Sequence, residues 1–170
     1  MALCRLDSCA GCRCEKVFIW RSDAAPVNSF VVTGLEGTVA IDPAADLTPE
    51  ALEFVGLPPI DAILLTHVQE EHVAGCANFP GISVFAPEGD AYLCEGREAY
   101  EKLPMKWAAP WDWTDRGNFK GRLAGAPNER PPEKRIELAG FLKDGETIKF
   151  LNVVATPGHG KHAVSLTLKT

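Results

Sequence analysis

The sequence predicts an α/β fold, in which short strands alternate with helical segments. Runs of β-branched and aromatic residues bounded by Gly, Pro, Asn and Asp recur along the chain, which is typical of short strands. Helix-start signals stand between these runs. Residues that commonly bind metal ions follow directly after two of the apolar runs. With 170 residues, the chain is long enough for one domain with a substantial core.

The predicted elements begin with strands joined by turns and continue as alternating strands and helices. The first helix has Thr48 as its N-cap and Pro49 in the first helical position, where the missing N–H of proline costs nothing. A second helix follows the polar segment after the fourth strand. The predicted strands are 17–20, 29–33, 38–41, 62–65, 82–85, 147–155 and 163–168, and the predicted helices are 48–55 and 70–78.

The most informative segment is T-H-V-Q-E-E-H, from Thr66 to His72. His67 and Gln69 are two positions apart, so their side chains leave the same side of an extended segment. His72 stands near the start of the predicted helix, where the chain can fold back and bring Glu71 alongside. Imidazole, amide and carboxylate groups are common donors to divalent cations. The alternative is a polar loop on a solvated surface, since His and Glu are common there.

This segment resembles the T-H-x-H-x-D-H signature of the metallo-beta-lactamase-fold superfamily. Gln69 stands where the second histidine is expected, and Glu71 stands where the aspartate is expected. Two other segments resemble the family in the same order. One is the pair of strands that ends at Asp42, and the other is T-P-G-H, which ends at His159. The resemblance covers roughly residues 16 to 170, with a poor match near 104 to 135.

The resemblance implies an α/β (α+β) metallo-beta-lactamase-like αββα sandwich. The family continues beyond the T-P-G-H strands into a further half that supplies more ligands. The domain is therefore expected at 16–170, truncated to its first half or two-thirds and incomplete at the C-terminus. The chain is expected to be a fragment of a longer protein. Alternatively, it completes its core by self-association through exposed strand edges.

The resemblance also implies a metal site. His67, Gln69 and His159 would surround one ion, and Glu71 with His72 would surround a second. Glu71 would also act as the catalytic base, and Asp42 would orient the ligands by hydrogen bonding. His162 is either an additional donor or a surface residue. The implied metal ligands are His67, Gln69, Glu71, His72 and His159.

The expected cofactor is zinc, as one or two ions. Iron and manganese are alternatives, because Gln69 offers an amide oxygen in place of an imidazole nitrogen. A zinc-class cation lowers the pKa of a bound water from about 16 to near 7. Glu71 is one methylene longer than aspartate, and a displacement of about 1 Å can cost on the order of 100-fold in rate. Both departures are expected to reduce activity, and the chain alone can be inactive.

Three functions remain open. The first is a metal-dependent hydrolase that acts on an ester, thioester, lactone, amide or phosphodiester bond of a small molecule. The second is a non-catalytic relative whose metal site has decayed and which acts as a binding module. The third is a non-heme iron oxidoreductase on the same fold. Gln69 and Glu71 favour the second function, whereas the oxygen-rich donor set gives some support to the third.

Composition excludes several partners. The formal net charge of −6 gives no basic surface for a nucleic-acid backbone. No apolar run approaches the length of a membrane span, and the N-terminus lacks the apolar core of a secretory signal. We therefore expect a cytoplasmic protein without nucleic-acid or membrane partners.

Two segments differ from the rest of the chain. Residues 1–15 hold four of the six cysteines and are expected to be a poorly ordered tract with reduced thiols, or alternatively a small metal site. The stretch 104–132 holds three of the four tryptophans among prolines and glycines. It is expected either to cover a substrate pocket or to cover an edge of the core.

Overall fold

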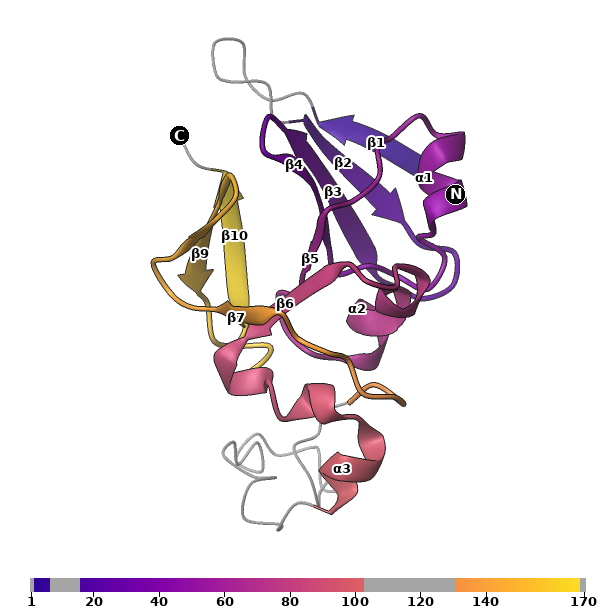
Figure 1. Ribbon diagram of the computed structural model, residues 1–170. Helices are drawn as coiled ribbons and strands as arrows, with labels where there is room; N and C mark the ends of the chain where they lie inside the picture. The colour runs from indigo at the N-terminus through magenta and orange to yellow at the C-terminus, as the bar shows by residue number, and fades with distance from the viewer. Residues whose placement is uncertain (1, 7–15, 103–130, 169–170) are drawn as a thin grey trace, which may run out of the picture.

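The structure is a computed structural model that describes residues 16–102 and 131–168, and the backbone of residues 2–6 (Figure 1). Its strands form two sheets. The larger sheet contains, in spatial order, β1 (Ala2–Leu6), β2 (Lys16–Arg21), β3 (Asn28–Gly34), β4 (Gly37–Ile41), β5 (Ala62–Leu64), β6 (Ser83–Pro87) and β7 (Gly140–Leu142). The smaller sheet has the order β10 (Val164–Leu168), β9 (Leu151–Ala155) and β8 (Thr147–Ile148).

The larger sheet changes direction at β4. Strands β1 to β4 pair antiparallel, whereas β4, β5, β6 and β7 pair parallel. The helical elements are α1 (Pro49–Phe54), α2 (Glu70–Val73), η1 (Ala74–Asn78), η2 (Glu88–Asp90), η3 (Leu93–Glu95) and α3 (Arg97–Glu101). Because β4 and β5 are parallel and adjacent, their carboxyl ends meet at one edge of the sheet. This edge carries the segment from Thr66 to His72.

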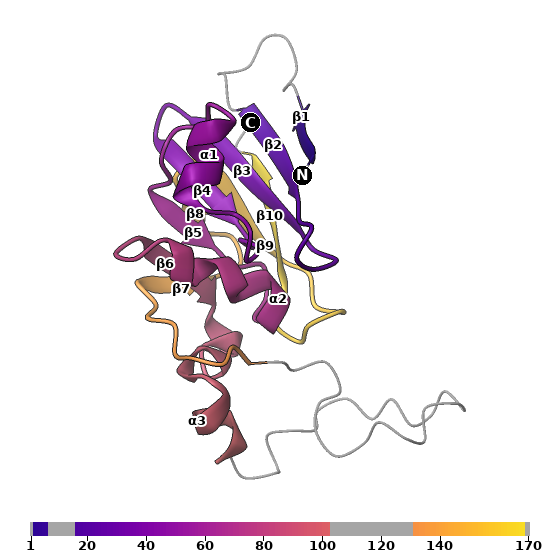
Figure 2. The ribbon, with the colours of Figure 1, turned by 90° about the vertical axis from the view of Figure 1, so that its right-hand side faces the viewer.

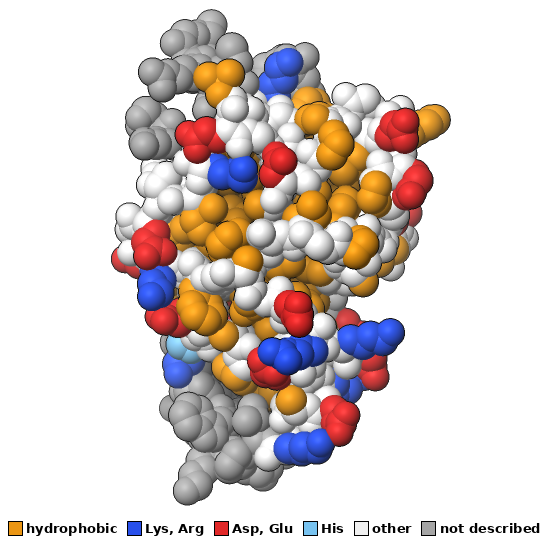
Figure 3. Space-filling view, viewed as in Figure 1, with side chains coloured by type: hydrophobic (Ala, Val, Ile, Leu, Met, Phe, Trp, Pro, Cys, Tyr) orange, Lys and Arg blue, Asp and Glu red, His pale blue; other side chains and the backbone are white. Residues whose placement is uncertain are grey.

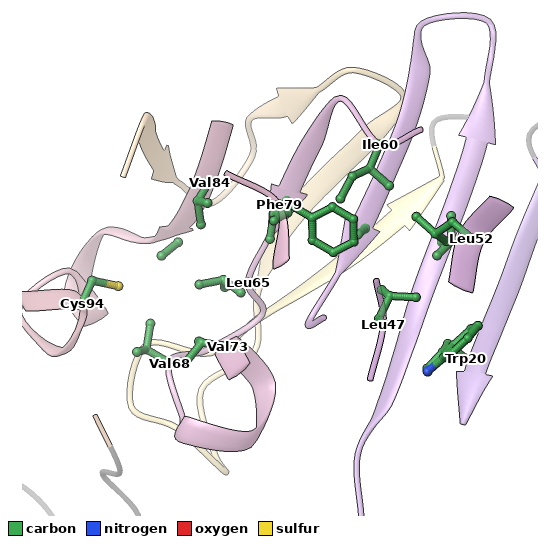
Figure 4. Close-up of a cluster of buried hydrophobic side chains, with 14 of the residues drawn as sticks. Trp20, Leu47, Leu52, Ile60, Leu65, Val68, Val73, Phe79, Val84 and Cys94 are labelled. Atoms are coloured by element: carbon green, nitrogen blue, oxygen red, sulfur yellow. The ribbon is translucent and has the colours of Figure 1, made fainter. Parts of the chain in front are cut away.

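The larger sheet buries both of its faces. On one face, side chains such as Val31, Ala40 and Ile63 pack beneath α1 and α2. Figure 4 shows other members of this core, among them Leu52 of α1 and Val73 of α2. On the other face, the alternate residues, such as Val32 and Leu64, pack against the smaller sheet. Figure 2 shows α1 and α2 in front of the larger sheet and β9 and β10 behind it. The fold is therefore layered as helices, sheet and sheet, which confirms the predicted α/β class.

Most predicted strands are confirmed, but 147–155 is not one continuous strand. It contains β8, a two-residue turn and β9, which pair antiparallel with Ile148 opposite Leu151. Lys149 has a φ of 54° in this turn, and Phe150 is buried against the larger sheet. The prediction was wrong here because the apolar residues on both sides of Lys149 resemble one strand.

The predicted helix over 48–55 is confirmed as α1. The Thr48 hydroxyl accepts a hydrogen bond from the Ala51 N–H at 3.1 Å, and Pro49 is the first helical residue. The predicted helix over 70–78 is divided into α2 and the 3-10 helix η1. Gly75 donates its N–H to the Pro43 carbonyl at 2.7 Å, and a Cβ at Gly75 would overlap backbone atoms of the neighbouring turn. The divided helix therefore brings α2 close to the end of β4.

Two strands, β1 and β7, were not predicted. β1 pairs with β2 along its whole length, although it lies inside the cysteine-rich tract. The other residues of that tract, and the tryptophans of the 104–132 stretch, lie outside the described residues. Cys76 and Cys94, in contrast, are described, and both are free thiols. The predicted boundary between 1–15 and 16–170 therefore stays a prediction.

Part of the apolar surface remains exposed within the described residues. Val154, on the outer face of the smaller sheet, is 41% exposed, and Phe141 in β7 is also 41% exposed. Figure 3 shows hydrophobic side chains gathered across the middle of one face, with charged side chains around them. Self-association through such surfaces stays a prediction. No helix in the described part of the chain is long and apolar enough to cross a membrane.

Candidate metal centre

The site begins where two parallel strands end. Asp42 follows β4 directly and donates its backbone N–H to the Leu64 carbonyl at 3.1 Å, at the end of β5. Asp42 has a φ of 48°, a left-handed conformation that Asp adopts more readily than most residues. This turn places the Asp42 carboxylate beside the segment that follows β5. Asp42 is buried, at 6% exposed.

The Asp42 carboxylate connects the two strand ends to α2. One oxygen accepts the Thr66 backbone N–H at 2.7 Å. The other accepts the Thr66 hydroxyl at 2.6 Å and contacts the His72 Nδ1 at 3.2 Å. Since a carboxylate only accepts hydrogen bonds, His72 carries its proton on Nδ1 and leaves Nε2 as the nitrogen with a lone pair. These contacts are the ones that the predicted orienting role of Asp42 requires.

Hydrogen bonding also assigns the proton of His67. The Thr66 hydroxyl gives its only hydrogen to Asp42, so it accepts from the His67 Nδ1, which lies 3.0 Å away. The lone pair of His67 therefore belongs to Nε2. This atom is buried and has no hydrogen-bond partner among the described residues. Buried nitrogen atoms without a partner are rare in proteins, and a neutral imidazole nitrogen is a common donor to a cation.

Three imidazole rings come together at this point. The ring centroids of His67 and His72 are 4.2 Å apart, and those of His67 and His159 are 5.1 Å apart with the rings nearly perpendicular. His67 and His72 come from the loop and helix after β5, whereas His159 comes from the loop between β9 and β10. The cluster therefore joins the two sheets, and Gln69 and His159, which are 90 positions apart in sequence, meet beside it.

The environment keeps His67 neutral. Burial is the largest effect that lowers the pKa of His67, and the nearby His72 lowers it further. Asp42 and the Gln69 amide act in the opposite direction without reversing the shift, and His159 adds a smaller lowering effect. A neutral imidazole is the form that binds a metal ion.

The other predicted ligands are placed less directly. The Gln69 Oε1 lies 3.3 Å from the His159 Nε2, so the amide and this imidazole face each other. His159 itself is exposed, whereas Gln69 is buried at 7% exposed. Glu71 is half-buried in the first turn of α2. Within the described residues, the group of potential ligand atoms that all lie within 4.8 Å of one another contains Asp42, His67 and His72.

His162 does not join the imidazole cluster. Its ring packs against Gly89 in η2, where a Cβ would overlap the ring atoms. The sequence also gave no indication of Asp90. The buried carboxylate of Asp90 accepts a hydrogen bond from the Val68 backbone N–H at 3.2 Å. Asp90 lies 22 positions after Val68 in the sequence. No local sequence pattern connects residues so far apart. Thr66, in contrast, is part of the T-H-V-Q-E-E-H motif itself.

A hollow of about 700 Å³ adjoins the cluster. Asp42, Thr66 and His72 form one end, and apolar side chains of β2, β3 and β10, such as Phe30 and Leu166, form much of the remainder. Its lining contains no Lys or Arg side chain within the described part of the chain. The polar groups of the site therefore face a mainly apolar space between the two sheets.

Comparisons with solved structures place this architecture among known folds. AidC, a dizinc quorum-quenching lactonase, is 16% identical with a TM-score of 0.52; the match covers 91% of this chain and 53% of that chain. An N-acyl homoserine lactone hydrolase is 16% identical with a TM-score of 0.50, over 99% of this chain and 67% of that chain. A protein solved in a di-iron-bound form is 23% identical with a TM-score of 0.48, over 95% and 66%.

The likenesses to AidC and to the N-acyl homoserine lactone hydrolase show a shared fold. The chain spans between about half and two thirds of the length of these three structures. No curated protein matches the sequence. The model of the metallo-beta-lactamase superfamily matches residues 22–170, which include every residue of the cluster. The sequence match and the arrangement of Asp42, His67 and His72 lead to the same conclusion. This chain belongs to the metallo-beta-lactamase superfamily.

Proposed function

We propose that this domain belongs to a metal-dependent hydrolase that acts on acyl bonds of small molecules, with zinc as its favoured ion. The observation that carries the proposal is the buried Nε2 of His67, which lacks a hydrogen-bond partner among the described residues and adjoins two other imidazoles. A buried polar atom without a partner destabilises a fold. A divalent cation would satisfy this lone pair, because neutral imidazole is among its commonest protein ligands.

The donor set fits such an ion. His67, His72 and His159 would hold it, with the Gln69 oxygen as a further donor. A bound zinc-class cation supplies Lewis acidity and makes a hydroxide nucleophile available near neutral pH. The chain itself supplies orientation, because Asp42 accepts hydrogen bonds from the Thr66 hydroxyl and the His72 Nδ1–H. Together with the contact of Thr66 and His67, these bonds keep the Nε2 lone pairs of His67 and His72 available. We assign Glu71 the role of base, from the first turn of α2.

The hollow beside Asp42, Thr66 and His72 supports an uncharged acyl substrate over a phosphodiester. The adjoining hollow is largely apolar and presents no Lys or Arg within the described residues. A phosphodiester site usually carries such cations, which neutralise the phosphate charge. The similar fold of a lactonase adds support for an ester-like bond, such as a lactone or thioester.

A second candidate is a binding module with a decayed metal site. The contact of 3.3 Å between the Gln69 Oε1 and the His159 Nε2 favours it. An imidazole nitrogen that donates to an amide oxygen in this way has its proton where a metal would bind. In this alternative, His159 cannot bind a metal ion because its Nε2 is protonated, and the domain only binds a ligand without catalysis.

Elemental analysis together with hydrolysis assays tests the proposal. We expect at least about one metal ion per chain, and turnover of lactone or thioester substrates that falls at least about 100-fold in His67→Ala and His159→Ala. Lys161→Ala, on the same exposed loop as His159, is the matched control and should keep full activity.

A protein without stoichiometric metal would contradict the proposal and support the binding module. Stoichiometric metal without turnover of any acyl substrate would also contradict a hydrolase. Bound iron with oxygen consumption would instead support the oxidoreductase alternative.

A further inference from the structure

The turn η2, Glu88–Asp90, lies between the two loops that deliver the imidazoles. It follows β6, the strand beside β5, and its residues contact both loops. We propose that Gly89 and Asp90 are positioning residues that set the separation between His67 and His159. This inference rests on the proposed metal site and extends it to residues outside the ligand set.

Asp90 acts on the first loop. Its carboxylate accepts the Val68 backbone N–H at 3.2 Å, and Val68 stands between the predicted ligands His67 and Gln69. Asp90 is only 5% exposed, and Val68 is 2% exposed, so water cannot easily replace this hydrogen bond. A buried carboxylate is costly unless it has such partners. Its placement here therefore fixes the backbone on which both ligand side chains depend.

Gly89 acts on the second loop. The His162 ring packs directly against its backbone, in space that any Cβ at position 89 would occupy. His162 belongs to the loop between β9 and β10, which also carries His159. The Thr156 N–H donates to the Ala163 carbonyl at 2.9 Å, so this loop is closed at its base. A displacement of His162 therefore moves the loop that holds His159.

The two loops also touch each other at one side of the cluster. The Val164 N–H donates to the Thr66 carbonyl at 2.9 Å, and a Cβ at Gly160 would lie 3.5 Å from the His67 Cβ. These contacts join the loops near their bases, whereas η2 contacts them from the side of β6. The separation of His67 and His159 is therefore set both by the contacts between the two loops and by the contacts of η2 with each loop.

Two ionisable side chains on or near η2 are Cys94 and Glu88. The Cys94 thiol is close enough that Asp90 contributes, after burial, to raising the pKa of Cys94 to about 12. Cys94 therefore stays neutral at physiological pH and adds no charge to this region. Glu88, in contrast, is exposed and pairs with Lys143 at 3.5 Å, away from the buried hydrogen bond of Asp90.

The test measures Zn²⁺ affinity by competition with a chromophoric chelator, using the full chain. We expect Asp90→Ala to weaken Zn²⁺ binding by about 10- to 100-fold, as is found for residues that orient metal ligands. Asp90→Asn keeps an oxygen acceptor and should recover most of this loss. Glu88→Ala is the matched control from the same turn, and its affinity should equal that of the unmodified chain. Thermal unfolding of each variant verifies that it is folded.

A double-mutant cycle tests the second contact. Gly89→Ala should weaken Zn²⁺ binding by about tenfold, because the added methyl group displaces the His162 ring. In a His162→Ala background, the same change should cause no further loss, since the ring is absent. Additive losses would show that Gly89 acts independently of His162 and would overturn this part of the inference.

The outcomes separate this inference from the proposed function. If the unmodified chain binds no Zn²⁺, the proposed function fails. If the unmodified chain binds Zn²⁺, and folded Asp90→Ala and Gly89→Ala variants bind it as tightly as Glu88→Ala does, the positioning role is overturned while the metal site stands.

Discussion

The two loops that form the candidate metal centre differ in how firmly the fold supports them. The loop that carries His67 follows a buried parallel strand, and its imidazole is only 7% exposed. Its protonation is set by a chain of hydrogen bonds through Thr66 to Asp42. The loop that carries His159 is exposed and joins two antiparallel strands of the smaller sheet. One half of the site is therefore preorganised, whereas the other is placed by contacts between the sheets.

The largest expected effect concerns the preorganised half. Asp42→Ala removes the acceptor for three hydrogen-bond donors, and the resulting unpaired groups should destabilise the fold by about 3 kcal/mol. Chemical denaturation measures this change. Asp42→Asn, which keeps an oxygen acceptor, should lose less. Equal stability of Asp42→Ala and the unmodified chain would show that these bonds do not support the site.

The next effect compares the two loops directly. His67→Ala should abolish measurable binding of Zn²⁺, whereas His159→Ala should weaken it by about 10- to 100-fold, because two oriented imidazoles remain. Isothermal titration with Zn²⁺ measures both. If His159→Ala lost as much affinity as His67→Ala, the exposed loop would be as important as the buried one.

A smaller effect is expected at Thr66. Thr66→Val removes the hydroxyl that accepts a hydrogen bond from the His67 Nδ1–H, so the tautomer of His67 should no longer be fixed. Zn²⁺ affinity should therefore fall by about tenfold. Thr66→Ser keeps the hydroxyl and serves as the control. The ¹⁵N shifts of the His67 ring report the tautomer. An unchanged tautomer in Thr66→Val would contradict the assignment made from hydrogen bonding.

The smallest expected effect concerns the reactivity of two thiols, Cys76 and Cys94, in the core beneath the loop that carries His67. Burial raises the pKa of both Cys76 and Cys94 to about 12, so both stay protonated and poorly reactive up to about pH 9. The thiolate fraction grows only as the pH approaches the raised pKa. Iodoacetamide should label these residues only after unfolding, as peptide mapping can show. Rapid labelling of the native chain would indicate that this core is less rigid than the structure implies.

The sequence predicted the fold and indicated where to expect the site, because both features have local signals. The strand before Thr66 is a run of apolar residues, and the cap of α1 needs only Thr48 and Pro49. What the sequence did not predict depends on distant contacts. The turn at Lys149 is explained by the burial of Phe150 against another sheet, and the division of the helix at Gly75 by the backbone of Pro43.

Within the site, too, the features that the sequence did not predict depend on contacts between residues distant in sequence. The motif indicated His67 and His72 as ligands, but not which nitrogen of each ring is available. That information needs the contacts of Asp42, which lies 24 positions from Thr66 and 30 from His72. Asp90 and Gly89 have no signal in the sequence, because their contacts exist only after β6 has packed beside β5.

We expect His67 and His72 to keep their protons on Nδ1 and to present Nε2 to a metal ion. Imidazole ¹⁵N NMR of the full chain, recorded before and after one equivalent of Zn²⁺, tests it most directly. The Nε2 resonances of both rings should shift on metal binding while each Nδ1 stays protonated. Unchanged Nε2 resonances, or a shift at Nδ1 in their place, would contradict it.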